Sequence, residues 1–133
     1  MFLLDTNTCI FFLNSSSDPI RENMEKYGPE QIALCSVVKA ELLFGALKSA
    51  RVEQNMEKLQ KFFQPFRSFY FDDAAADIYG QIRSTLERQG TRIGPNDLMI
   101  AAIAVSRRAI LVTNNVQEFG RVQNLEIQDW TSQ

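Results

Sequence analysis

Histidine is absent from this chain of 133 residues, and cysteine occurs only twice. Without histidine there is no Ser-His-Asp or Cys-His nucleophilic site, no imidazole general base and no His-ligated zinc. The two cysteines, Cys9 and Cys35, lie in apolar segments without CxxC spacing, so they cannot form a four-thiolate metal site. We expect both to be small core residues. Any chemistry must therefore come from carboxylates, amides, hydroxyls, Lys or Arg.

Long apolar runs and long basic runs are also missing. No stretch approaches the length of a membrane span, and the first apolar run ends at Asp5, too early for a signal peptide. The formal net charge of −2 excludes a protein that holds nucleic acid by charge alone, although it is compatible with a metal-assisted nuclease. With 45% hydrophobic residues the chain is typical of a globular protein. We expect one cytoplasmic domain over residues 1–133, with no membrane partner.

Apolar runs alternate with helical patterns along the chain. The predicted strands cover about 2–4, 31–35, 66–70, 109–112 and 125–127. The predicted helices cover about 9–13, 19–27, 36–48, 51–64, 72–89 and 94–107, with Ser36 as the expected cap of the third. Strands separated by helices predict an α/β fold in which helices cover both faces of a parallel sheet.

Polar side chains follow two of these strands directly. Asp5 comes after the first strand, and Asn114, Asn115 and Glu118 come after the strand at 109–112. In a parallel α/β sheet the functional crevice lies beyond the carboxyl ends of the strands. We therefore expect these side chains to meet at one edge of the sheet.

Two further acids occupy helix faces that are otherwise apolar. Glu41 shares its face with Val38 and Phe44, and Asp97 shares its face with Ile100. A carboxylate on such a face is costly unless it has a partner, and no Lys or Arg shares either face. Asp5, Glu41 and Asp97 together would favour a hard, oxygen-seeking cation, Mg²⁺ or Mn²⁺, and such a site suits phosphate chemistry.

Each acid also has an ordinary explanation. Asp5 is a good helix cap, Asp97 is a first-turn acid that complements the helix dipole, and Glu41 can turn outward to solvent. Spacing leaves these alternatives open, because a single sequence does not show that the three acids meet.

Four segments resemble the motifs of a known family, in its order and spacing. They are Leu3–Asn7, Val37–Gly45, Ile93–Ala102 and Val112–Phe119. Together they resemble the PIN-domain family, and within it the VapC toxins, from Met1 to about Trp130. The resemblance implies a three-layer α/β/α fold with a central parallel sheet of four to five short strands. It also implies a Mg²⁺-dependent endoribonuclease that a cognate VapB antitoxin holds inactive.

The resemblance extends to individual residues. By position, Asp5, Glu41 and Asp97 match the acidic metal-binding residues of the family, with Asp5 and Asp97 as direct ligands. Three supporting polar residues, Thr6, Asn7 and Thr113, match as well.

The fourth acid of the family is where this sequence departs. Many members carry an Asp after the fourth strand, where this chain reads Asn114-Asn115. Either Glu118 takes the catalytic role, or an amide such as that of Asn115 holds a water or the metal. An ordinary surface role for Glu118 also stays open, as does the number of metal ions.

Three short segments narrow the resemblance to a subgroup. Gly94–Asp97, Thr113–Asn115 and Asp129-Trp130 resemble the VapC toxins that cut initiator tRNA in its anticodon loop. The subgroup therefore implies initiator tRNA as the RNA substrate.

Two functions of other classes stay open. One is a PIN-like module that binds RNA or protein without cutting. The other is a phosphatase with Asp5 as nucleophile, although such enzymes usually carry a second Asp where this chain has Asn7.

The remaining features concern packing and partners. The aromatic-rich segment 62–71 predicts core packing and the interface of a homodimer. Ile10, Phe11 and Phe12 are expected to be core residues, and any of them left exposed would form a groove for an antitoxin helix. The candidate RNA-phosphate contacts, or else plain solvated charges, are Arg83, Arg88, Arg92, Arg107 and Arg108.

Overall fold

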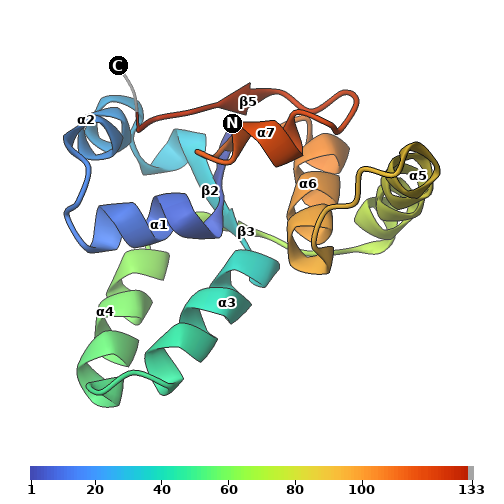
Figure 1. Ribbon diagram of the computed structural model, residues 1–133. Helices are drawn as coiled ribbons and strands as arrows, with labels where there is room; N and C mark the ends of the chain where they lie inside the picture. Colours follow the sequence, from blue (N-terminus) through green and yellow to red (C-terminus); the bar gives the residue numbers. More distant parts are fainter. Residues whose placement is uncertain (132–133) are drawn as a thin grey trace.

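A five-stranded parallel sheet runs through the middle of the molecule (Figure 1). The computed structural model describes residues 1–131, so the last two positions of the predicted domain lie outside the described residues. The strands are β1 (Phe2–Leu4), β2 (Ile32–Cys35), β3 (Arg67–Phe69), β4 (Ile110–Val112) and β5 (Ile127–Gln128). Their order in the sheet is β3-β2-β1-β4-β5, and every pairing is parallel. The predicted α/β class and parallel sheet are confirmed.

Helices on both sides of the sheet complete a three-layer arrangement (Figure 1). They are α1 (Thr6–Leu13), α2 (Asp18–Tyr27), α3 (Ser36–Leu47), α4 (Val52–Phe63), α5 (Asp73–Gln89), α6 (Pro95–Arg107) and α7 (Val116–Phe119), with a 3₁₀ turn, η1 (Pro29–Gln31). The short α7 was not predicted, because four residues are too few to show helical periodicity. None of the helices in residues 1–131 has both the length and the apolar character needed to cross a membrane.

Local signals explain several helix boundaries. The Asp5 carboxylate caps α1 by accepting the Thr8 N–H, and Asp72 caps α5 in the same way. Gly90 ends α5 in the left-handed conformation, with φ of 72°, which glycine adopts without strain. The predicted cap at Ser36 is wrong. Cys35 holds the cap position of α3 and Ser36 is already helical, so no side chain caps this helix.

The core lies between the sheet and the helices that cover it. β1 and β2 are buried at every position, as expected for central strands covered on both faces. Helix α6 is buried from Ile100 to Ala104, and its alanines allow close packing between the sheet and α5. Cys9 and Cys35 are fully buried free thiols, so their predicted core role is confirmed.

The aromatic residues are divided between core and surface. In the segment 62–71, Phe62, Phe63 and Phe69 are buried as predicted, but Tyr70 is 64% exposed. The core prediction is confirmed for these three phenylalanines, whereas Tyr70, which follows β3 as the chain leaves the sheet, lies outside the core. Near the C-terminus, Trp130 is buried and stacks on Tyr27 at 5.6 Å between ring centroids.

Candidate active site

The site is built at the carboxyl ends of β1 and β4, which are neighbours in the sheet. Asp5 follows β1, and its backbone N–H donates to the Val112 carbonyl at 3.0 Å. This bond holds Asp5 next to the end of β4, where Thr113 follows. Both side chains are buried, Asp5 at 5% exposure and Thr113 at 0%. Two polar side chains are thus held at one point where strands end and helices begin.

Asp5 is both a helix cap and a member of this site. Burial raises the pKa of Asp5, and the charge of Glu41 adds to the increase. Hydrogen bonds from the Thr113 side chain and the Thr8 backbone oppose the shift in this pKa, and the Thr8 N–H lies 2.9 Å from Oδ1. The two interpretations of Asp5 that the sequence left open are therefore compatible. Capping α1 is what orients the carboxylate.

Glu41 comes from α3 and joins the site through two donors. The Thr6 hydroxyl donates to Oε1 of Glu41 at 2.5 Å, and the Asn96 side-chain amide donates to Oε2 at 3.3 Å. Thr6 belongs to α1 and Asn96 to α6, so the Glu41 carboxylate connects three helices. The prediction that Glu41 needs a partner agrees with this arrangement.

The helix face that carries Glu41 differs from the prediction, which took it as apolar and buried. Val38 is fully buried, but Phe44, one turn after Glu41, is 64% exposed. The reason is visible in Figure 1, where α3 and α4 form a hairpin that projects away from the sheet. The face therefore passes from core to solvent, and half-buried Glu41 lies at the boundary.

Asp97 lies in the first turn of α6 and has the most perturbed carboxyl group of the site. Its pKa is raised to about 6, first by burial and then by the charges of Glu41, Asp5 and Glu118. Within residues 1–131 its carboxylate accepts no hydrogen bond and forms no ion pair. The negative charge of Asp97 is therefore uncompensated by the protein.

Glu118 and Asn115 both reach this region, and they contact each other. The Asn115 side-chain amide donates to Oε2 of Glu118 at 2.8 Å, and the Asn115 backbone N–H donates to the Thr113 hydroxyl oxygen at 3.0 Å. Glu118 is close enough to raise the pKa of Asp97. The two candidates for the missing fourth acid thus form one hydrogen-bonded pair. Asn7 is exposed, and its side chain makes no hydrogen bond within the described chain.

The donor set suits a hard divalent cation. Three carboxylates, those of Asp5, Glu41 and Glu118, lie around Asp97. None of the four acids has a Lys or Arg ion pair in residues 1–131, and oxygen donors are what Mg²⁺ and Mn²⁺ prefer. No three acidic, Cys or His side chains of that part of the chain are near enough to one another to hold an ion as they stand. A bound cation would relieve the mutual repulsion and draw the carboxylates inward.

The arginines predicted to contact RNA divide into two groups. Arg107 is ion-paired with Asp72, and Arg83 is ion-paired with Glu87 at 2.8 Å. The first pair joins α6 to the start of α5 and the second lies within α5, so these two arginines are less available to a substrate. The other three are exposed and have no ion pair among residues 1–131: Arg88, Arg92 and Arg108.

Asn96 is a site residue that the sequence analysis missed. It appeared there only as part of a motif, between Pro95 and Asp97. The available signal was its position beside an acid in the first turn of a helix, where an amide can reach a neighbouring element. Its target, Glu41, is far away in the sequence and was not visible from the motif.

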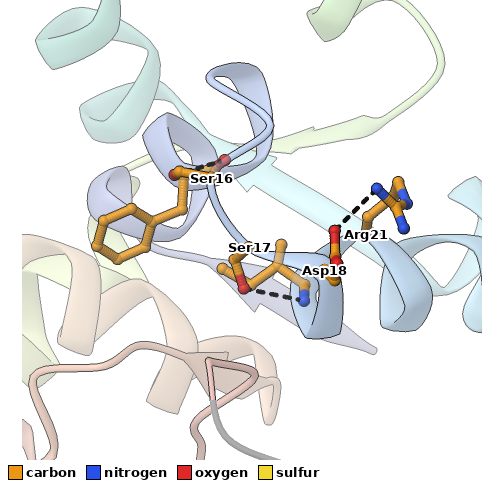
Figure 2. Close-up of polar contacts among 6 residues, drawn as sticks. Ser16, Ser17, Asp18 and Arg21 are labelled. Carbon is orange, nitrogen blue, oxygen red and sulfur yellow. Dashed lines mark hydrogen bonds and ion pairs between the residues drawn. The ribbon is translucent and has the colours of Figure 1, made fainter.

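A separate apolar groove of about 520 Å³ lies between α1, α2 and the end of α4. Phe12, Met24 and Arg21 are among the residues that line it. Figure 2 shows the turn that joins α1 to α2. There Ser17 caps α2 by accepting the Ile20 N–H, and Arg21 is ion-paired with Asp18 at 3.0 Å. These contacts hold the turn beside the groove.

Comparison with known proteins gives consistent matches. The PIN-domain family matches residues 2–125. The chain is 40% identical over 131 residues to ribonuclease VapC2 of Rickettsia felis, covering 98% of each chain. It is 40% identical over 129 residues to the tRNA(fMet)-specific endonuclease VapC of Salmonella typhimurium, covering 97% of each. Among solved structures, DNA-bound VapBC from Salmonella typhimurium aligns with a TM-score of 0.92 at 40% identity over 97% of both chains.

Proposed function

Since this chain belongs to the PIN-domain family and, within it, to the VapC ribonucleases, we propose that it is the toxin of a VapBC pair and a metal-dependent endoribonuclease. The observation that carries the proposal is the uncompensated carboxylate of Asp97, surrounded by Asp5, Glu41 and Glu118. A cation would relieve the repulsion in this arrangement, and a cation among carboxylates suits phosphodiester hydrolysis.

Asp5, Glu41 and Asp97 would hold the ion, directly or through water, with Mg²⁺ as the expected metal and Mn²⁺ as a substitute. A bound divalent ion would supply positive charge at the scissile phosphate and activate water for attack. The chain's own contribution is to hold the acids in place: Thr113 and the Thr8 N–H orient Asp5, and Thr6 orients Glu41. Glu118 would take the role of the fourth acid, supported by the hydrogen bond that it accepts from Asn115.

For the substrate we propose initiator tRNA, cut in its anticodon loop. The relative from Salmonella typhimurium is named a tRNA(fMet)-specific endonuclease, and its sequence matches over nearly the full length of this chain. A single-stranded loop is also the kind of RNA that a protein reads by exposed bases. We expect the protein to act in the cytoplasm, where tRNA is found.

For the partner we propose a VapB-type antitoxin. Related solved structures are VapBC assemblies, including VapBC2 from Rickettsia felis, with a TM-score of 0.89 and 39% identity over 97% of this chain and 98% of that one. The groove between α1, α2 and α4 has the apolar lining that an amphipathic helix needs. Phe12, one of the residues predicted to form such a groove, is half-buried there. The predicted homodimer stays a prediction.

A cleavage assay tests the nuclease. Antitoxin-free protein would be incubated with initiator tRNA and with total bacterial RNA, with Mg²⁺ or with EDTA. Wild type is compared with Asp5→Ala and with Asp77→Ala, because Asp77 is an exposed acid on α5 outside the site. We expect discrete products that require both Mg²⁺ and Asp5 and that persist in Asp77→Ala.

Other outcomes would favour the other classes of function. RNA binding without cleavage by folded wild type would indicate a binding module. A trapped acyl-phosphate on Asp5 would indicate a phosphatase. Cleavage of total RNA but not of initiator tRNA would keep the nuclease and overturn the substrate.

A further inference from the structure

Both carboxylate oxygens of Glu41 are occupied by donors from different helices. Thr6 approaches Oε1 from the first residue of α1, and Asn96 approaches Oε2 from the first turn of α6. Each donor is the immediate neighbour of another site acid, Thr6 of Asp5 and Asn96 of Asp97. The Glu41 carboxylate is therefore tied to the two segments that carry the other acids.

The two hydrogen bonds to Glu41 act against its repulsion from the other acids of the site. Glu41 carries the same charge as Asp5 and Asp97, so these carboxylates repel one another when they are ionised. Glu41 has a long, flexible side chain and lies where its helix face reaches solvent. Without donors, repulsion and side-chain entropy would both favour a carboxylate turned out to water. Two donors from fixed backbone positions keep it facing inward.

We propose that Asn96 is a positioning residue that, together with Thr6, holds Glu41 toward Asp5 and Asp97 for cation binding. The inference rests on the proposed function of the site. Asn96 acts through Glu41, with no contact to the reacting atoms. Its amide offers donors and no negative charge, so it steadies the carboxylate without adding to the repulsion.

Exposure separates this role from a structural one. Asn96 is exposed, and an exposed hydrogen bond contributes little to the free energy of unfolding. Loss of the amide should therefore leave the unfolding midpoint unchanged while it alters metal binding. A residue that served only to hold the fold would show the reverse.

The experiment is a double-mutant cycle on full-length protein, with kcat/KM for RNA cleavage and the Kd for Mg²⁺ measured by calorimetry. The variants are Asn96→Ala, Glu41→Gln and the double variant. Asn23→Ala is the matched control, because its amide also donates one hydrogen bond, to the Pro19 carbonyl at 3.0 Å, on α2. We expect Asn96→Ala to lower kcat/KM about tenfold and to weaken Mg²⁺ binding several-fold. In the Glu41→Gln background the same change should have almost no effect.

A second pair of variants guards against misfolding. If Asn96→Ala does not fold, Thr6→Val and Thr6→Ser test the other donor, since serine retains the hydroxyl and valine does not. Asn96→Asp should be worse than Asn96→Ala, because it places a like charge against Glu41.

The proposal and the proposed function fail in different ways. Wild type that binds Mg²⁺ but cuts no RNA overturns the nuclease, while the Mg²⁺ affinities of the variants still test Asn96. The positioning role would be overturned if Asn96→Ala lowered kcat/KM by the same factor in the wild-type and in the Glu41→Gln background. A normal Mg²⁺ affinity in folded Asn96→Ala would overturn it as well.

Discussion

The negative charge of Asp5, at the end of β1, contributes to raising the pKa of Asp97, in the first turn of α6, to about 6. Two acids from distant parts of the chain thus destabilise each other's ionised forms in the folded protein. The metal-free fold contains a repulsion that a bound cation would remove. Several measurable properties depend on this relationship.

Removal of the Asp97 charge should stabilise the metal-free protein and abolish cleavage. A pKa near 6 instead of 3.8 corresponds to at most about 3 kcal/mol, which solvent screening of this half-exposed group reduces to about 1 kcal/mol. We expect Asp97→Asn to raise the free energy of unfolding by that amount in urea and to lower kcat/KM at least a hundredfold. Asp77→Asn serves as the control. Intact metal-dependent cleavage by Asp97→Asn would contradict the assignment.

The stability of the metal-free protein should depend on pH with a defined sign. Between pH 3.8 and about 6 the folded state binds more protons at Asp97 than the unfolded state does. Stability should therefore increase as the pH falls from 7 to about 5, and Asp97→Asn should reduce this dependence. Added Mg²⁺ should flatten the curve near pH 7, because the cation compensates the charge. Urea unfolding at several pH values measures this. Stability that falls over the same pH range in EDTA would show that Asp97 is not repelled as described.

The Thr113 side chain should affect the pKa of Asp5 as well as the stability of the fold. Its buried hydroxyl hydrogen bonds to Asp5 and accepts the Asn115 N–H. Thr113→Val, which has nearly the same shape, should cost about 1–2 kcal/mol of stability, because polar groups lose buried partners. It should also raise the pKa of Asp5 further, and a carboxyl-carbon NMR titration would detect this. Thr113→Ser should restore both properties. An unchanged pKa of Asp5 in Thr113→Val would show that the Thr113 hydroxyl does not act on this carboxyl group.

Glu118 should behave as a contributing acid. Glu118→Gln removes one of the charges that raise the pKa of Asp97, so that pKa should fall. We expect cleavage to decrease about tenfold, less than for Asp97→Asn, because the charge of Glu118 acts on Asp97 more weakly than the charges of Glu41 and Asp5 do. Activity at several Mg²⁺ concentrations, together with an NMR titration of Asp97, measures both effects. If Glu118→Gln kept the wild-type activity and the wild-type pKa of Asp97, Glu118 would be an ordinary surface acid.

Arg92 should affect RNA binding more than chemistry. It lies in the segment that leads into α6 and has no ion pair within residues 1–131, whereas Arg83 is paired with Glu87. Arg92→Ala should raise KM severalfold with little change in kcat and should reduce the salt dependence of RNA binding by about 0.7 in slope. Arg83→Ala is the comparison and should have the smaller effect. A loss confined to kcat would contradict a phosphate-binding role.

Much of the architecture was predictable from local patterns. The runs that became β1, β2 and β4 are apolar at nearly every position, as buried parallel strands require, and Gly90 marked the end of α5. The short α7 and the uncapped start of α3 were not predictable. Four residues show no period, and a serine beside a helix start looks like a cap whether or not its hydroxyl is used.

The sequence by itself determined the chemistry that is available, because the absence of histidine and of clustered cysteine leaves oxygen donors as the ligands for a metal. It also determined that Asp5 follows a buried strand. Only the tertiary structure decided that Glu41 lies near Asp5 and Asp97, and that Thr6 and Asn96 donate hydrogen bonds to it. Helical periodicity shows which residues share a face. What that face meets depends on how α1, α3 and α6 pack, and long-range packing leaves no local pattern in the chain.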